Sequence, residues 1–89
     1  MAWTIEFAGA ALRQLEKLDR SVQRRIWKFL NERLRALQNP RSIGEALHGE
    51  RLREFWKYRV GDYRLIARIE DDRLLVLVLK VGHRRDIYR

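Results

Sequence analysis

The 89-residue chain has no cysteine, one proline and two histidines. The lack of cysteine excludes disulfide bonds and cysteine-based zinc or redox sites. The longest uncharged apolar run, residues 74–79, is far shorter than the roughly 20 residues that cross a bilayer as a helix. The first residues lack the basic start and apolar stretch of a signal peptide. We therefore expect a soluble protein that stays in the cytoplasm.

What the chain has in abundance is positive charge and apolar surface. It contains 20 Lys and Arg against 12 Asp and Glu, a formal net charge of +8, which favours polyanionic partners. Hydrophobic residues make up 46% of the chain, enough for one core and too few for two. We expect a single domain over residues 1–89.

Apolar periodicity predicts the order of the elements. Alternation predicts a strand over residues 3–7, and helical spacing predicts one helix over 8–18 and another from Asp19 or Ser21 to residue 39. Residues 40–51 have no clear period and indicate a connecting loop with room for one helical turn. Three strands follow, over 52–60, 63–70 and 73–81. The sequence thus predicts an α+β fold with both helices on one face of a three-stranded antiparallel meander.

Both predicted helices carry charged or polar side chains on the side away from their apolar stripe. The second helix carries an outer row of cations that could bind nucleic acid or could simply be a solvated face: Arg24, Arg25, Lys28, Arg33 and Arg35. On the first helix we expect a set of polar side chains to point outward into water: Arg13, Gln14, Glu16 and Lys17.

The first predicted hairpin separates two kinds of side chain. A two-residue turn at Gly61 and Asp62 sets Arg59 opposite Arg64. One face then carries the apolar residues that we expect to pack on the helices: Trp56, Tyr58, Val60, Tyr63, Leu65, Ala67 and Ile69. The other face carries Lys57, Arg59, Arg64 and Arg68. We expect a similar two-residue turn at Asp71 and Asp72, and a central position for the strand with residues 74–79, which are apolar on both faces.

Arginines 59 and 64 form a like-charged pair, which destabilises a hairpin by about 0.2 to 1 kcal/mol. Either a bound phosphate neutralises them or both side chains extend into water. The segment 80–89 adds Lys80, His83, Arg84, Arg85, Tyr88 and Arg89, with Gly82 allowing a turn at the strand end. We expect these groups to line one end of the same cationic face.

This set of side chains suits RNA cleavage. The sequence has no carboxylate cluster, no pair of histidines at ligand spacing and no serine-nucleophile motif. RNA carries its own nucleophile, the 2′-hydroxyl, so cleavage needs a proton acceptor, cations and a proton donor. Lys57 or His83 could accept the proton, arginines could hold the phosphate, and Tyr88 or His83 could protonate the leaving oxygen. We expect no metal and no cofactor.

Residues 58–65 and 80–89 resemble the RelE toxins of bacterial toxin–antitoxin pairs, and nearly the whole chain fits that family's order of elements. The resemblance implies an mRNA endoribonuclease that acts on message in the ribosomal A site and is silenced by a cognate antitoxin wrapped around it. It implies catalytic roles for Arg64, Arg84, Tyr88, His83 and Lys57. We expect RNA-binding roles for Arg59, Arg68, Lys80, Arg85 and Arg89. Phe55 departs from the pattern, because a known member has lysine there.

Other functions remain open. The same superfamily contains ParE-like toxins that inhibit DNA gyrase, and the charge also fits a non-catalytic RNA- or ribosome-binding module. On the open sheet face, an apolar centre of Ile66, Leu75, Leu77 and Leu79 has a basic rim. This patch is either an interface for an acidic antitoxin segment in a hetero-oligomer or is covered by the protein's own helices or tail.

Overall fold

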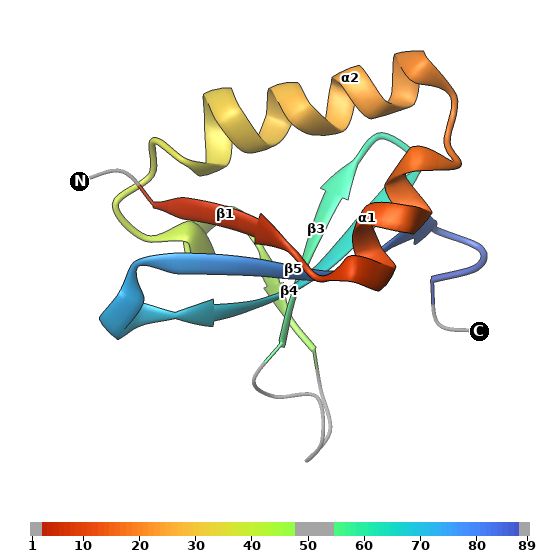
Figure 1. Ribbon diagram of the computed structural model, residues 1–89. Helices are drawn as coiled ribbons and strands as arrows, with labels where there is room; N and C mark the ends of the chain where they lie inside the picture. The colour runs from red at the N-terminus through yellow and green to blue at the C-terminus, as the bar shows by residue number, and fades with distance from the viewer. Residues whose placement is uncertain (1–2, 48–54, 88–89) are drawn as a thin grey trace.

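The computed structural model describes residues 3–47 and 55–87 (Figure 1). The helical elements are α1 (Gly9–Glu16), α2 (Arg20–Lys28), the π-helical η1 (Phe29–Leu34) and the 3-10 turns η2 (Pro40–Ile43) and η3 (Asp71–Arg73). The strands are β1 (Thr4–Phe7), β2 (Glu45–Ala46), β3 (Phe55–Val60), β4 (Tyr63–Glu70) and β5 (Leu75–His83). No helix in the described ranges is both long and apolar enough to cross a membrane.

The strands form one sheet in the order β1-β5-β4-β3-β2. Strands β3, β4 and β5 make the predicted antiparallel meander, and β5 is central as predicted, between β1 and β4. β1 runs parallel to β5, which requires a crossover connection, and the chain between the two includes both helices. The two-residue strand β2 was not predicted and pairs with β3 at Ala46 and Trp56.

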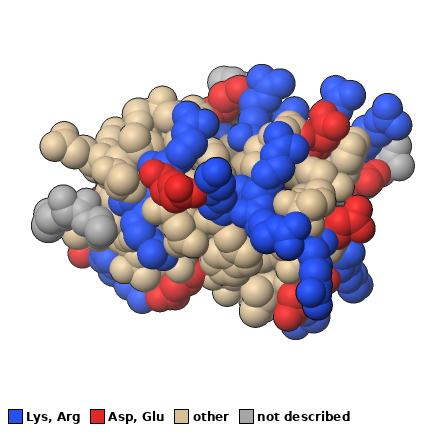
Figure 2. All heavy atoms as spheres, turned by 90° about the horizontal axis from the view of Figure 1, so that it is seen from above, with Lys and Arg blue, Asp and Glu red and all other residues tan. Residues whose placement is uncertain are grey.

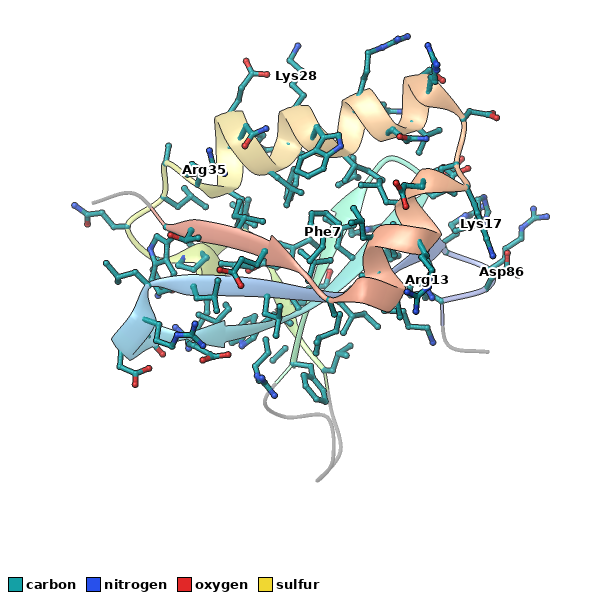
Figure 3. The ribbon with its side chains drawn as sticks, viewed as in Figure 1. Phe7, Arg13, Lys17, Lys28, Arg35 and Asp86 are labelled. Carbon is teal, nitrogen blue, oxygen red and sulfur yellow. The ribbon has the colours of Figure 1, made fainter. Side chains whose placement is uncertain are left out.

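Both helices cover the same face of the sheet, as predicted (Figures 1 and 3). The core joins helix residues Ala11, Leu15, Ile26, Leu30 and Leu34 to sheet residues Tyr58, Leu65, Ala67, Val76, Val78 and Val81. The helix over this core changes pitch, because Arg35 N donates to Leu30 O, five residues back. Because an α-helix has 3.6 residues per turn, side chains spaced four residues apart do not lie directly above one another. The π-helical turn contains more residues and reduces this offset, so both Leu30 and Leu34 stay buried.

The first hairpin has the predicted register, with Arg59 opposite Arg64 and Val60 opposite Tyr63. Gly61 has a φ of +59° and is the first central residue of the turn, as in a type II′ hairpin. The apolar residues predicted to face the helices all belong to the core or pack against it. The separation of the two faces is therefore confirmed.

The second hairpin differs from the prediction. Glu70 pairs with Leu75, so the loop has the four residues 71–74 rather than a two-residue turn at Asp71 and Asp72. The loop closes through the Leu74 amide, which donates to Asp71 O at 3.1 Å, and Leu74 takes a left-handed φ of +48° and packs against the core. Arg41 donates two hydrogen bonds to Asp71, of 2.9 and 2.7 Å, and this bonding lowers the pKa of the Asp71 carboxyl.

A β-bulge interrupts the pairing of β4 with β5. Ala67 pairs with Val78 but Ile66 pairs with Lys80, so Leu79 is the extra residue. The bulge returns Val81 to the core and moves Lys80 to the face away from the helices. The Val81 amide donates to Gln14 Oε1 on α1 at 2.8 Å. Strand β5 thus continues to His83, two residues beyond its predicted end.

The segment between α2 and β3 contains the expected helical turn, η2. The Tyr58 hydroxyl donates to Pro40 O at 2.7 Å, and burial raises the pKa of this phenol well above its ordinary value. A Cβ on Gly44 would lie 2.9 Å from Tyr58 Cε1, so glycine is required for this close approach. The rest of the predicted loop and the predicted strand start, residues 48–54, lie outside the described residues.

Candidate nucleic-acid interface

The face of the sheet away from the helices, here called the open face, carries most of the predicted cations. Lys57, Ile66 and Lys80 form one cross-strand row, and Arg59, Arg64 and Gly82 form the next. Arg68 pairs with Phe55 and Leu77 in a third row. The predicted clustering of Lys57, Arg59, Arg64 and Arg68 on one face is confirmed, and the bulge adds Lys80 to it.

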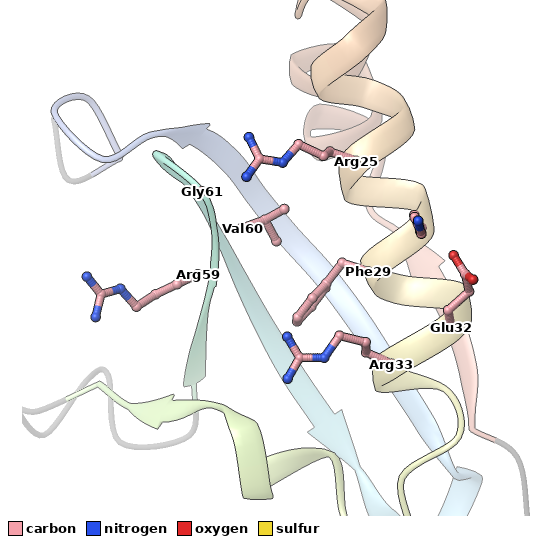
Figure 4. Close-up of a pocket in the computed structure, with 8 residues that line it drawn as sticks. Arg25, Phe29, Glu32, Arg33, Arg59, Val60 and Gly61 are labelled. Atoms are coloured by element: carbon pink, nitrogen blue, oxygen red, sulfur yellow. The ribbon is translucent and has the colours of Figure 1, made fainter.

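Arg64 is the one charged residue in the described ranges that is buried, with 8% of its surface exposed. Its Nη1 donates to Gly61 O and Tyr63 O, both at 2.9 Å. The hairpin carbonyls thus fix this guanidinium beside the turn. Arg59 is exposed and extends away from the α2–η1 helix (Figure 4).

Arg84 is attached to the same turn from the end of β5. Its backbone amide donates to Asp62 O at 2.8 Å, and its Nε lies 3.7 Å from Asp62 Oδ1. About half of its side chain is exposed, so it remains accessible. Arg64 and Arg84 are therefore anchored to the consecutive turn residues Gly61 and Asp62.

His83 does not lie on the open face, where we expected it. It pairs with Tyr63, whose side chain packs against the core, and the two rings meet edge to face at 5.4 Å between centroids. The bulge is the cause. Without it, side chains would alternate regularly after Val78, which faces the helices, and His83 would point to the open face. His83 Nδ1 accepts a hydrogen bond from the Arg85 amide at 3.2 Å.

Several other predicted residues have acidic neighbours or lie at the edge of the site. Lys57 Nζ is 3.6 Å from Glu45 Oε2, and Arg68 Nη2 is 3.4 Å from Glu70 Oε2. Arg85 is exposed in the turn after β5. Tyr88 and Arg89 lie outside the described residues. Within residues 3–47 and 55–87, no three His, Asp or Glu side chains converge as metal ligands.

Comparison with known proteins identifies the family. Residues 5–88 match the family model described as the ParE toxin of the type II toxin–antitoxin system parDE. The chain belongs to this toxin family. It is 36% identical over 89 residues to toxin RelG of Mycobacterium tuberculosis, covering 100% of this chain and 99% of that one. It is 32% identical over 84 residues to the mRNA interferase toxin RelE of Escherichia coli K12, covering 94% and 85% of the two chains.

The fold comparison agrees with the sequence comparison. The toxin–antitoxin complex RelBE2 of Mycobacterium tuberculosis contains a chain that superposes with a TM-score of 0.84 at 31% identity, covering 97% of this chain and 95% of that one. The predicted resemblance to RelE and the α+β class are both confirmed. The protein is a RelE-like toxin of a type II toxin–antitoxin system.

The end of the toxin covers part of its own open face. Ile87 is buried, and the amides of Asp86 and Ile87 both donate to His83 O, which turns the chain back after β5. Gly82 lies within β5 rather than in the turn, and a Cβ there would lie 3.4 Å from Ile87 Cδ1, which places Ile87 beside it. The tail therefore packs beside Gly82, and the choice between an interface and self-coverage for the apolar patch stays open.

The middle of the open face keeps an apolar patch, formed by Phe55, Ile66, Leu77 and Leu79. All four side chains are partly exposed, and Lys57, Arg68 and Lys80 border them in the sheet register. Leu75, predicted as a member of this patch, is buried. The toxin therefore presents apolar surface with a basic rim beside the two anchored arginines.

The role of Gln14 differs from the one expected from the sequence. We expected its side chain to point into water, but it accepts the hydrogen bond from the bulge amide of Val81. This contact spans 67 residues of sequence, and a lone polar residue on a polar helix face gives no signal of it. Gln14 holds the bulge that decides which face Lys80 and His83 occupy.

Proposed function

We propose that this toxin is an endoribonuclease that stops translation in the bacterial cytoplasm by cutting messenger RNA, with ribosome-bound message in the A site as its substrate. The carrying observation is that Arg64 and Arg84 are anchored to consecutive residues of one turn, at the edge of a cationic face. Two guanidiniums held in this way can stabilise the charge that develops on a phosphate during cleavage. The relative RelE of E. coli is named an mRNA interferase, which supports the proposal.

In the proposed reaction, RNA supplies the nucleophile. A base takes the proton of a ribose 2′-hydroxyl, the 2′-oxygen attacks the adjacent phosphorus, and the bond to the 5′-oxygen breaks as that oxygen receives a proton. Lys57 shares the open face with Arg64, which favours it over His83 as the base. Tyr88 or His83 would supply the proton to the leaving oxygen. None of these steps uses a metal.

The remaining open-face cations would guide the RNA strand. Arg59, Arg68, Lys80 and Arg85 lie on or beside this face, and Arg89 follows them in the chain. Contacts from such residues to phosphates add affinity without reading the base sequence. We propose that they position the message so that the scissile phosphate reaches Arg64 and Arg84.

We further propose that a cognate antitoxin binds the apolar patch and its basic rim, forming a hetero-oligomer in which cleavage is blocked. The relative in the RelBE2 structure is in a toxin–antitoxin complex. The partly exposed Phe55, Ile66, Leu77 and Leu79 offer apolar area to an amphipathic segment, and the surrounding cations favour an acidic one.

Primer extension on a defined message in a translating extract tests the nuclease proposal. The toxin would be compared with Arg64→Ala, Arg84→Ala and the control Arg13→Ala, which removes an exposed cation from α1, with chelator present throughout. We expect cleavage within codons by the unaltered toxin and the control, and loss of at least 100-fold in both other variants. Arg64→Lys and circular dichroism would separate loss of chemistry from loss of folding, because Arg64 is buried.

Intact message combined with arrested growth would contradict this proposal. Induction of DNA damage signalling would then support gyrase inhibition, the alternative that the ParE name of the matching family model favours. Salt-dependent RNA binding without cleavage would instead support a non-catalytic binding module.

A further inference from the structure

A second cationic site lies on the helix side of the first hairpin. A pocket of about 400 Å³ opens between the α2–η1 helix and the end of β3 (Figure 4). Its lining residues are Arg25, Lys28, Phe29, Glu32, Arg33, Arg59, Val60 and Gly61. β2 pairs with β3 only at Trp56 and Lys57, so the last residues of β3 border this pocket without a neighbouring strand on that side.

Four cations line the pocket, Arg25, Lys28, Arg33 and Arg59, and two of them, Arg25 and Arg33, define the candidate site. Both extend from the helix toward β3, on either side of the Phe29 ring, whereas Glu32 points away from β3 (Figure 4). The Arg33 guanidinium carbon lies 5.8 Å from the Phe29 ring centroid. Neither arginine forms an ion pair within the described ranges, so both can bind an anion.

Arg25 lies against the turn that anchors the candidate catalytic arginines. Its Nη1 and Nη2 atoms are each 3.0 Å from the position that a Cβ on Gly61 would occupy. The carbonyl of the same glycine accepts the hydrogen bond from Arg64. The β3–β4 turn therefore has one guanidinium on each side, and a strand that passes around it would meet Arg64 and then Arg25.

The pocket fits a polyanion better than an amphipathic peptide. Its two apolar side chains, Phe29 and Val60, are each only 8% exposed, and five of its eight lining residues are Arg, Lys or Glu. Lys and Arg side chains are spread over the helix-covered surface seen from above, with acidic ones between them (Figure 2). Among these cations, Arg25 and Arg33 differ in converging on a hollow.

We propose that this pocket binds the phosphodiester backbone of single-stranded RNA. The site would hold the stretch of message next to the phosphate that is cut, so the inference rests on the proposed nuclease function. Arg25 and Arg33 are eight residues apart on the α2–η1 helix and lie on either side of Phe29, which fits two phosphates of one strand better than a single anion.

Binding of a labelled single-stranded RNA, measured by fluorescence anisotropy between 50 and 200 mM salt, tests this site. The RNA carries 2′-O-methyl groups throughout, so that it cannot be cleaved. Arg25→Gln combined with Arg33→Gln is compared with Arg24→Gln combined with Arg35→Gln, a control that removes equal charge from exposed positions outside the pocket. We expect the pocket variant to bind about tenfold more weakly and the control less than threefold. The salt slope of the pocket variant should fall by about 1.4, the value for two single-strand phosphates.

Equal losses in the two double variants would overturn the proposal, because they would indicate diffuse charge rather than a site. Unchanged RNA binding with weakened antitoxin binding would also overturn it and would assign the pocket to the protein partner. Failure here remains distinguishable from failure of the nuclease proposal. Primer extension with the unaltered toxin reports cleavage, whereas the modified RNA reports binding alone.

Discussion

The two faces of the sheet differ in what their side chains do. Under the helices, Leu15, Ile26, Leu30 and Leu65 are almost completely buried in one core. On the open face, Ile66 and Leu77 stay partly exposed between cations, and only the tail residue Ile87 closes one end. One face therefore supplies most of the folding free energy, and the other can carry exposed cations and apolar groups for partners because stability depends less on it.

The largest effect should come from breaking the core. Leu30→Ala removes a fully buried side chain and should lower the free energy of unfolding by about 2–5 kcal/mol. Leu77→Ala on the open face should cost about 1 kcal/mol, because that side chain is already partly hydrated. Urea unfolding of both variants measures the difference. Equal losses would mean that the open face is as well packed as the core.

A somewhat smaller effect should come from crowding the covered face. Gly44→Ala would place a Cβ 2.9 Å from the Tyr58 ring, which cannot move easily because it is buried and its hydroxyl bonds to Pro40. Overpacking of this kind should lower stability by about 1–3 kcal/mol in thermal or urea unfolding. Gly9→Ala is the matched control, since its nearest side-chain atom is Arg13 Nη1 at 3.5 Å. A loss of similar size at Gly9 would contradict the steric explanation.

Gln14 on α1 accepts a hydrogen bond from the Val81 amide at the bulge of β5, and removal of its side chain should destabilise the bulge. Gln14→Ala leaves the Val81 amide without its acceptor and should cost about 1–2 kcal/mol. Hydrogen exchange at the Val81 amide should accelerate more than at neighbouring β5 amides. Gln14→Glu keeps an acceptor oxygen and should retain protection. Unchanged exchange in the alanine variant would show that the bulge is stable without α1.

The smallest effect concerns the ion pair of Arg41 and Asp71 at the surface. Because Arg41 lowers the pKa of Asp71, their hydrogen bonding stabilises the fold above the ordinary Asp pKa of 3.8 and is lost as the pH falls through the lower folded-state pKa. The stability gap between wild type and Arg41→Gln should therefore narrow as the pH drops below 3.8. Melting curves from pH 7 to pH 2.5 test this. A gap that stays constant would contradict it, and Asp71→Asn should add nothing to Arg41→Gln.

The sequence correctly predicted the features of β3 and β4 that depend on a local pattern. The period of two in β3 and β4, with a glycine at the turn, was enough to set Arg59 opposite Arg64 and to separate the faces. The bulge could not be predicted, because it depends on the distant contact of Gln14 with Val81. This one inserted residue explains two of the errors, the misplacement of His83 and the early end assigned to β5.

The candidate site was accessible from sequence for a different reason. The strand pattern predicted that Arg84 and Arg64 lie at the same end of the cationic face, and the resemblance to RelE singled out these two arginines, but neither predicted that both are anchored to one turn. The pocket at Arg25 and Arg33 was visible only as a row of cations on a helix, which could not be distinguished from a solvated face. Arg25 and Arg33 form a candidate site only together with the end of β3, and the sequence pattern does not show that this strand end lies beside the helix.

The parallel pairing of β1 with β5 has a consequence for how the molecule forms. β1 binds no strand other than β5 in this sheet, and about 70 residues of chain separate the two partners. During synthesis the first strand must therefore wait until nearly the whole chain has emerged before its backbone can pair. Contacts of such long sequence separation slow folding. We expect the core and the cationic face to assemble together and late, so that an unfinished chain would lack the toxin's activity.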